Sequence, residues 1–331
     1  MLLLNLIPLI DVTFSTPTPV LVSRVVFLIT GEYSQGMNMR TSLMLLLALP
    51  LAYGQSSNAQ APANPLVKKI AFEVRHERGL TPQVEIFILD FPAAKATRLV
   101  EGLTPKWSPA GQQLAFCTRT GGGFGQVEII NADGSGRTLL TQMRGGACPT
   151  DWSADGETIL ATAYGAGTST IFTMSRKGQN ITQLAHGYGA QWSPDGSQIV
   201  FCRAAETRGS HGSIWIADSD GKNAKQVIED DSPVLEVSWF PDGKSVAFAS
   251  SRNPKRDAAI FRVNSDGSSL QQIASDKHLP IFFPVVSPDG SQLVVDGINS
   301  SDNRVLLLDL RTNRISTLAH GLHPSVIWEK H

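Results

Sequence analysis

Cysteine is scarce in this chain, and neither sign of charge is in excess. Cys117, Cys148 and Cys202 are the 3 cysteines among 331 residues. A disulfide framework needs more cysteines and an even number of them. Cys117 and Cys202 each follow a repeated tryptophan by ten residues in non-adjacent units, so we expect them to be too far apart to bond. All three are predicted to be buried thiols that behave as small apolar side chains.

The net charge is −1, from 28 basic and 29 acidic residues. No long-range field therefore attracts nucleic acid or anionic lipid, and neither is an expected partner.

Catalytic signatures are also missing from the sequence. There is no Gly-x-Ser-x-Gly nucleophile elbow and no His-Glu-x-x-His pair, and the glycine-rich run 121–125 follows a strand but opens no helix. We therefore predict no catalytic residues, no metal site and no cofactor, and we do not expect an enzyme.

Apolar runs long enough to span a membrane are lacking as well. Met39 and Arg40 precede the apolar stretch Leu43–Leu51, and a small-x-small site ends at Gly54. This pattern is typical of a secretory signal peptide, and its apolar run is about half of a membrane span. We interpret residues 1–54 as a leader, in which 1–36 arise from an over-extended start and 39–54 are the signal, and residues 55–66 as a polar linker. The mature protein is expected to be periplasmic or secreted, without stable membrane insertion.

What the sequence does contain is a repeat. Near-copies of the phrase Trp-Ser-Pro-Asp-Gly begin at Trp107, Trp152, Trp192 and Trp239, and a fifth has Val286 in place of the tryptophan. The intervals of 45, 40, 47 and 47 residues fit one four-stranded blade of a β-propeller per period.

Counting apolar strands predicts six blades. A triplet follows each turn phrase, and a sixth triplet, Ile70-Ala71-Phe72, opens the domain without one. Because triplets with apolar residues on both faces suit sheets stacked between neighbouring sheets, we predict an all-β, six-bladed propeller of four-stranded antiparallel blades over residues 67–331. Residues 324–328 repeat an inner strand and are predicted to complete the first blade, which closes the ring.

The conspicuous aspartates and tryptophans are explained by the scaffold. Each repeated aspartate precedes a glycine, so we interpret it as a turn residue that bonds the local backbone. Asp133-Gly134, Asp220-Gly221 and Asp266-Gly267 are predicted to form two-residue hairpins. The tryptophans share one structural position and are expected to pack between blades.

The repeat loses its uniformity where an outer strand leads to the next blade's inner strand. Repeats that agree in their scaffold and differ at one rim are arranged as a binding face would be, although solvated loops are polar in any case. The predicted partner-binding rim comprises Glu101, Arg144, His186, Tyr188, Asp231, His278, His320 and His323. His186 and His320 are expected three blades apart, too far to share a metal ion.

These blades resemble the WD-repeat-like blades of the TolB family, most clearly at residues 191–201 and 238–248. The resemblance implies a periplasmic six-bladed propeller that serves as a protein-interaction platform in the Tol–Pal envelope system. TolB itself carries an α/β domain ahead of its propeller, whereas only the short linker follows the predicted signal here. We therefore expect a TolB-like propeller without that domain, a monomer that binds a protein or another envelope component.

The sequence also leaves enzymatic alternatives open. Similar blades precede the hydrolase domain of prolyl oligopeptidase relatives, but only residues 329–331 follow Trp328, so that arrangement is not expected. The alternative function is a stand-alone propeller enzyme, a metal-dependent lyase or a lactonase or other hydrolase, with its site in the central channel.

Overall fold

The computed structural model describes residues 67–76, 83–93, 95–120, 123–165, 168–204, 212–229, 234, 236–252, 258–299 and 302–329. All of them belong to one compact unit, Gln60–His331. The predicted leader, signal peptide and linker lie outside the described residues, as does Asp231. Within the described part every regular element is a strand, and no helix there is long and apolar enough to cross a membrane.

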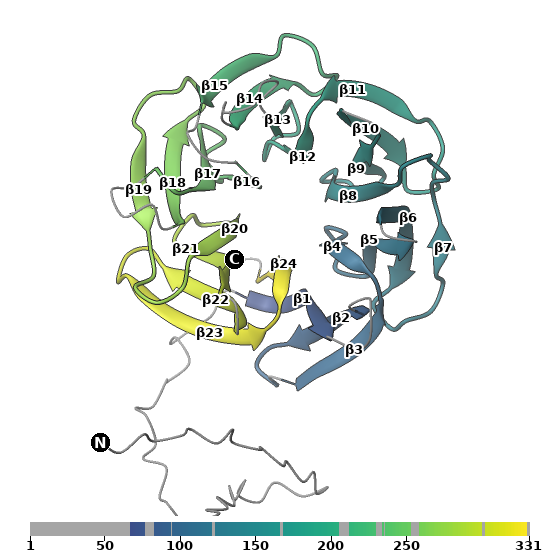
Figure 1. Ribbon diagram of the computed structural model, residues 1–331, viewed down its shortest axis with the longest axis horizontal. Helices are drawn as coiled ribbons and strands as arrows, with labels where there is room; N and C mark the ends of the chain where they lie inside the picture. Colours follow the sequence, from purple (N-terminus) through teal and green to yellow (C-terminus); the bar gives the residue numbers. More distant parts are fainter. Residues whose placement is uncertain are drawn as a thin grey trace, which may run out of the picture. The chain divides into compact units, whose positions relative to one another are not determined.

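The strands β1–β24 form six four-stranded antiparallel sheets arranged as blades around a ring (Figure 1). Blade 1 has the order β24-β1-β2-β3, and blades 2 to 6 take β4–β7, β8–β11, β12–β15, β16–β19 and β20–β23 in sequence. The predicted fold class is therefore confirmed.

Each blade contributes one strand at each distance from the centre of the ring. The inner strands of blades 1 to 6 are β24 (Leu322–Trp328), β4 (Leu103–Trp107), β8 (Ala147–Trp152), β12 (Tyr188–Trp192), β16 (Val237–Trp239) and β20 (Ile281–Val286). The second strands are β1 (Val67–His76), β5 (Gln113–Thr120), β9 (Thr158–Tyr164), β13 (Gln198–Arg203), β17 (Ser245–Ser250) and β21 (Gln292–Ile298). The third strands are β2 (Gln83–Asp90), β6 (Gly123–Asn131), β10 (Ser169–Ser175), β14 (Ser213–Asp218), β18 (Ala259–Asn264) and β22 (Asn303–Asp309). The outer strands are β3 (Lys95–Glu101), β7 (Thr138–Leu139), β11 (Thr182–His186), β15 (Lys225–Glu229), β19 (Gln271–Ala274) and β23 (Arg314–His320).

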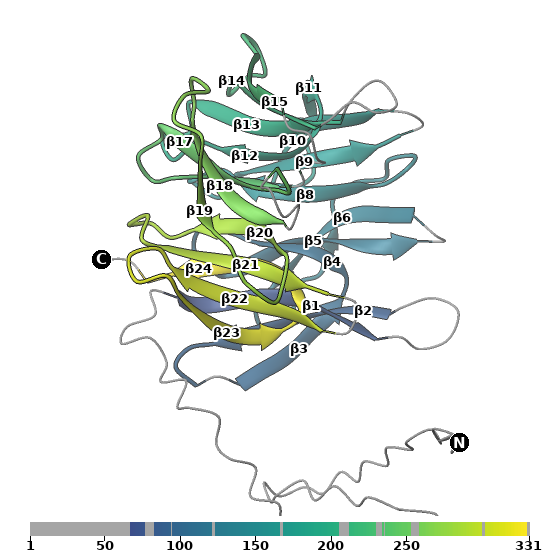
Figure 2. The same ribbon diagram turned by 60° about the vertical axis from the view of Figure 1, so that its left-hand side comes forward.

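The C-terminal strand closes the ring, as predicted. β24 pairs antiparallel with β1, with Val326 opposite Ile70 and Ser325 opposite Ala71. The two strands lie side by side between blade 6 and blade 2 in Figures 1 and 2. Blade 1 therefore combines the two ends of the propeller, and the sheet of the first repeat has no exposed inner edge.

The apolar triplets lie at the centre of the blades. Leu114, Ala115 and Phe116 of β5 are completely buried, because β5 is covered on both faces by neighbouring blades. The repeated tryptophans pack between blades, as Trp152 shows: its indole Nε1 donates to the carbonyl of Lys106 in the preceding blade at 3.0 Å. Trp192 is less completely buried than the other three.

The aspartates of the turns bond their own backbone, as predicted. Asp195 Oδ1 accepts the amide of Ser197 at 3.0 Å, and Asp155 Oδ1 accepts that of Glu157 at 2.9 Å. Gly196 follows Asp195 with φ of 71°, a left-handed conformation that an L side chain rarely adopts. The carboxylates of these turns are thus used by the scaffold.

The outer hairpins are longer than predicted. Asn131 donates its amide to Ser135 at 2.9 Å, and only Gly134 of the Asp133-Gly134 pair has a positive φ, 86°. The prediction of a two-residue turn was wrong, because this arrangement is a three-residue loop that ends in a left-handed glycine. The same amide-to-carbonyl bond joins Asp218 to Lys222 and Asn264 to Ser268.

Candidate functional site

The inner strands bulge at one repeated position, which faces the neighbouring blade. Thr104, Phe283 and His323 have φ of 47°, 51° and 50° there, and Gly189 has 64°. The pairing of β4, β12, β20 and β24 with their second strands shifts register around these residues. A bulge leaves a backbone amide without its ladder partner, so the amide can bond another blade.

The residue after each apolar triplet accepts that amide in three blades. Glu73 Oε1 accepts the amide of Thr104 at 2.6 Å, and Asp296 Oδ2 accepts that of His323 at 2.9 Å. Thr162 Oγ1 accepts the amide of Gly189 at 3.3 Å. In each case a polar side chain of one blade thus forms a hydrogen bond with the inner strand of the next blade.

A disulfide takes the same place between blades 2 and 3. Cys117 follows the triplet of β5 and is bonded to Cys148 in β8 of the next blade. The prediction of free buried thiols was therefore wrong for these two cysteines, because the position after the triplet faces the adjacent inner strand. It holds for Cys202, which is free and buried.

Replacing both Cys117 and Cys148 by serine should lower the free energy of unfolding by about 2–4 kcal/mol, because the bond closes a loop of 31 residues in the unfolded chain. Urea denaturation of the variant and of the oxidised wild type measures the difference, with Cys202→Ala as the control. Identical midpoints for the wild type and the double variant would contradict the cross-link.

The contacts between blade 6, blade 1 and blade 2 gather three ionisable groups. His323 Nδ1 lies 2.9 Å from Glu73 Oε1, and both Glu73 and Asp296 are fully buried, while the His323 side chain is 20% exposed. The imidazole and the ring of Phe283 are nearly perpendicular, with centroids 4.5 Å apart. One histidine of the closing strand is therefore held between two buried carboxylates.

The pKa values of this cluster depend on one another. Burial alone would lower the pKa of His323, but the charges of Glu73 and Asp296 raise it to about 9. Burial raises the pKa of Asp296 to about 7. Burial also acts to raise the pKa of Glu73, yet His323 holds it below its usual range. The Glu73–His323 pair is thus charged at neutral pH.

An ion pair joins opposite sides of the ring. Lys106 of β4 in blade 2 places its Nζ 3.5 Å from Oε2 of Glu236, which directly precedes β16 in blade 5. Blades 2 and 5 are three positions apart in a ring of six, so the pair crosses the central channel. Burial raises the pKa of Asp151 to about 6, and the negative charge of Glu236 acts in the same direction.

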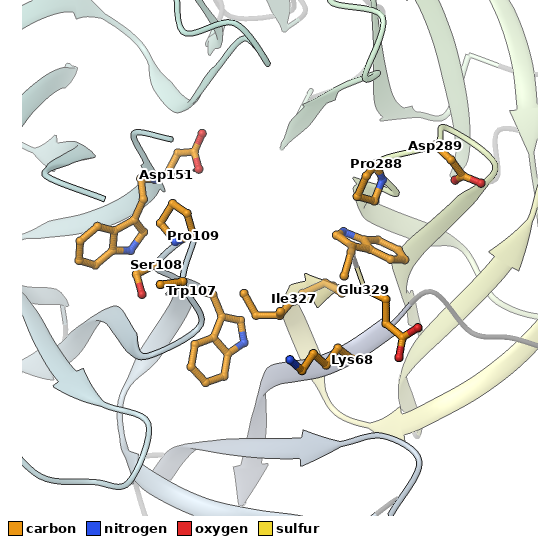
Figure 3. A pocket seen from close by; sticks show the side chains of 13 residues that line it. Lys68, Trp107, Ser108, Pro109, Asp151, Pro288, Asp289, Ile327 and Glu329 are labelled. Atoms are coloured by element: carbon orange, nitrogen blue, oxygen red, sulfur yellow. Dashed lines mark hydrogen bonds between the residues drawn. The ribbon is translucent and has the colours of Figure 1, made fainter. Parts of the chain in front are cut away.

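A cavity of about 1060 Å³ lies at the end of the channel where the repeated turns are found. Blades 1, 2, 3 and 6 all contribute to it, and we call it the mouth pocket (Figure 3). It is lined by Lys68, Trp107, Ser108, Pro109, Ala110, Asp151, Trp152, Pro288, Asp289, Val326, Ile327, Trp328 and Glu329. Blades that are far apart in the sequence thus share one concave, partly aromatic surface.

The residues of the predicted rim lie elsewhere. Glu101, His186 and His320 are the last residues of outer strands, and His186 and His320 occupy corresponding places in blades 3 and 6, as expected. Arg144 and His278 are exposed on connecting segments. None of the seven described members of the rim lines the mouth pocket.

Some rim residues have internal partners. Tyr188 donates its hydroxyl to the carbonyl of Val234 at 2.7 Å, and His320 Nδ1 lies 3.3 Å from Asp302. His323 belongs to the buried cluster with Glu73. Among the described residues, no hydrogen bond or ion pair joins two members of the rim, so their joint role as a binding face stays a prediction.

Sequence reasoning missed the charged residues of the channel. Glu73 and Asp296 follow apolar triplets, and Lys106 and Asp151 directly precede repeat tryptophans. A comparison of all six copies at these two positions would have found them. Among the described residues, no group of three or more His, Cys, Asp or Glu side chains is placed to hold a metal ion.

Comparisons with known proteins agree with the blade geometry. Residues 186–326 match the family model described as the TolB beta propeller domain. The chain is 27% identical over 123 residues to the Tol-Pal system protein TolB of Anaeromyxobacter dehalogenans, and that match covers 36% of this chain and 27% of the relative. It is 27% identical over 156 residues to the uncharacterized peptidase YuxL of Bacillus subtilis, which covers 47% of this chain and 22% of the relative.

Among solved structures, TolB from Acinetobacter baumannii superimposes with a TM-score of 0.66 at 17% sequence identity, over 80% of this chain and 67% of that chain. At this identity the superposition supports the fold alone. The chain spans only about a quarter of the length of the two curated relatives above. The blade repeat and the six-bladed ring thus show a β-propeller, and its residues 186–326 are similar to the TolB beta propeller domain.

Proposed function

We propose that this propeller is a non-catalytic protein-binding module of the bacterial cell envelope, and that its partner binds at the mouth pocket. The observation that carries the proposal is the pocket itself, a cavity of about 1060 Å³ built by four of the six blades. Concave surfaces with a few placed polar groups are the usual ligand sites of proteins.

A protein partner fits the lining of the pocket. Trp328 and Ile327 are partly exposed there, beside Pro109 and Pro288 from the turns of blades 2 and 6. Aromatic side chains at such sites tend to provide much of the binding energy in protein complexes. Similarity to a relative named as a Tol-Pal system protein also favours an envelope partner.

Export is part of the proposal. The predicted signal peptide at residues 39–54 directs the chain out of the cytoplasm. The Cys117–Cys148 disulfide fits an oxidising compartment such as the bacterial periplasm, because reducing systems keep most cytoplasmic thiols free.

Filling the pocket should abolish binding. Ala110→Trp introduces a large side chain at an exposed turn residue that lines the pocket, and we expect it to reduce capture of the partner from envelope extract at least tenfold. Ala93→Trp makes the same substitution at an exposed turn residue between β2 and β3, away from the pocket, and should leave capture unchanged. Quantitative mass spectrometry of the captured proteins provides the comparison.

Two other results would redirect the proposal. If Arg144→Ala alone abolished capture, the partner would bind at the rim predicted from the sequence. If the purified protein hydrolysed peptides and captured no partner, the enzymatic alternative would gain support, in line with the match to a relative named as a peptidase.

A further inference from the structure

The charges in the mouth pocket are unequal. Three carboxylates, those of Asp151, Asp289 and Glu329, line it together with one ammonium group, that of Lys68. They come from different blades: Asp151 from blade 3, Asp289 from the turn of blade 6, and Lys68 from blade 1. The surface that meets a ligand is therefore acidic even though the protein as a whole is nearly neutral.

One of these carboxylates is already neutralised by the scaffold. Asp289 Oδ1 accepts the Ser287 hydroxyl at 2.7 Å and the Ser291 amide at 3.0 Å. The guanidinium of Arg311 lies 3.6 Å from its other oxygen. Asp289 is thus a turn residue with a nearby counter-ion, and it adds little unbalanced charge to the pocket.

Asp151 is different, because it is partly buried and forms no ion pair with a described residue. Its two oxygens accept the backbone amides of Trp152 at 2.8 Å and Trp192 at 2.9 Å, and no ion pair of the described chain includes it. Lys106, whose charge stabilises the ionised form of Asp151, is paired with Glu236 across the channel. Figure 3 shows the Asp151 carboxylate on a different side of the pocket from Lys68.

Glu329 provides the second unbalanced charge, at the outer edge. It is exposed, and no ion pair of the described residues includes it. Pro109, Pro288 and Ile327 supply apolar surface to the same pocket, and such surface can cover the alkyl part of a long cationic side chain while its charged end reaches a carboxylate.

We propose that the mouth pocket selects a lysine or arginine side chain of the partner, which lies along the proline and isoleucine surface and pairs with Asp151, while Glu329 attracts the surrounding basic segment. This inference rests on the proposed function and adds the chemistry of the bound segment. A charge-assisted bond to a partly buried carboxylate that forms no ion pair within the described chain is among the stronger polar contacts, whereas an acidic segment would be repelled by the like charges of Asp151 and Glu329.

The test uses capped nonapeptides of alanine and glutamine that carry lysine, arginine, norleucine or glutamate at the central position. Binding to the full-length protein is followed by tryptophan fluorescence, since Trp107, Trp152 and Trp328 line the pocket. We expect the lysine and arginine peptides to bind at least about tenfold more tightly than the norleucine peptide, and the glutamate peptide to bind most weakly.

Substitutions inside and outside the mouth pocket test whether the peptides bind there. Lys68→Glu should tighten lysine-peptide binding, and Glu329→Gln should weaken it, each by about two- to fivefold. Lys95→Glu makes the same charge change on exposed β3, outside the pocket, and should change nothing. Asp151→Asn should reduce affinity at least about tenfold. Because that variant disturbs two backbone contacts, the Lys68 and Glu329 variants keep the test decisive if it fails to fold.

Three results would overturn the inference: equal binding of all four peptides, preference for glutamate, or identical effects of Lys68→Glu and Lys95→Glu. Failure of every peptide to bind, while Ala110→Trp still abolishes partner capture, would reject the cationic ligand and leave the proposed function standing. Peptide binding that Ala110→Trp does not affect would reject the pocket as the site.

Discussion

Deletion of residues 324–331 should open the ring and lower the melting temperature by about 10 °C or more. The deletion removes most of β24, including the buried Pro324 and Ser325 and the partly buried Val326, Ile327 and Trp328. The loss of their apolar contacts costs about 5 kcal/mol, and the whole inner edge of β1 becomes exposed. Calorimetry and size-exclusion chromatography measure the loss of stability and the association of opened rings.

A shorter deletion is the control for this prediction. Removing residues 329–331 leaves β24 complete, so the melting temperature should stay within about 2 °C of the wild type. If the longer deletion melted like the wild type, closure by β24 would not stabilise the propeller.

His323→Ala should destabilise the protein by about 3–5 kcal/mol, because it leaves the fully buried Glu73 without its closest cation. Glu73 still receives the amide of Thr104, and the Arg75 guanidinium lies 3.7 Å from its other oxygen. These contacts do not replace the 2.9 Å ion pair. Chemical denaturation at pH 7 measures the loss, and His278→Ala, at an exposed histidine, should have little effect.

The pH dependence separates this ion pair from a loss of packing. The pKa of His323 is raised from its ordinary 6.5 to about 9 in the folded protein. A raised histidine pKa contributes stability that is complete below pH 6.5 and is lost as the pH rises through about 9. The wild type should therefore lose stability between pH 7 and 9, and His323→Ala should lose much less over that range. Parallel curves would show that His323 acts through packing alone.

The repeat made the architecture predictable. A fixed period of turn phrases, each followed by an apolar triplet, specifies a stack of equal sheets, and the unmatched triplet at Ile70 required a partner strand from elsewhere in the chain. The turn aspartates were predictable for a similar reason, because an Asx-type contact depends only on neighbouring residues.

Contacts between blades were harder to predict. Cys117 and Cys148 stand at different positions in their own repeats. A comparison of equivalent positions considered only Cys117 and Cys202, which were correctly expected not to bond, and it missed the bond to Cys148. Glu73 and Asp296 follow apolar triplets, as do Thr162 and Cys202. The role of the charged side chains, Glu73 and Asp296, cannot be predicted without the structure. Each accepts a backbone amide from the bulge in the inner strand of the next blade.

The candidate site was the least predictable part. Charged residues in connecting segments indicated the rim, whereas the mouth pocket is made of turn residues that look like scaffold in the sequence. Pro109 and Pro288 belong to the repeated phrase itself, and Lys68 and Glu329 line the same pocket only because the two ends of the propeller pair in blade 1. Nothing local in the sequence marks such a surface, which depends on closure of the ring.

Site-specific photocrosslinking in cells tests the central claim most directly. Benzoylphenylalanine placed at Glu329 probes the mouth pocket, and the same probe at Glu101 samples the rim, since both residues are exposed. We predict one discrete protein adduct from position 329, lost in the Ala110→Trp background, and none from position 101. An adduct from position 101 alone, or no adduct from position 329, would contradict a protein-binding module that acts through its channel mouth.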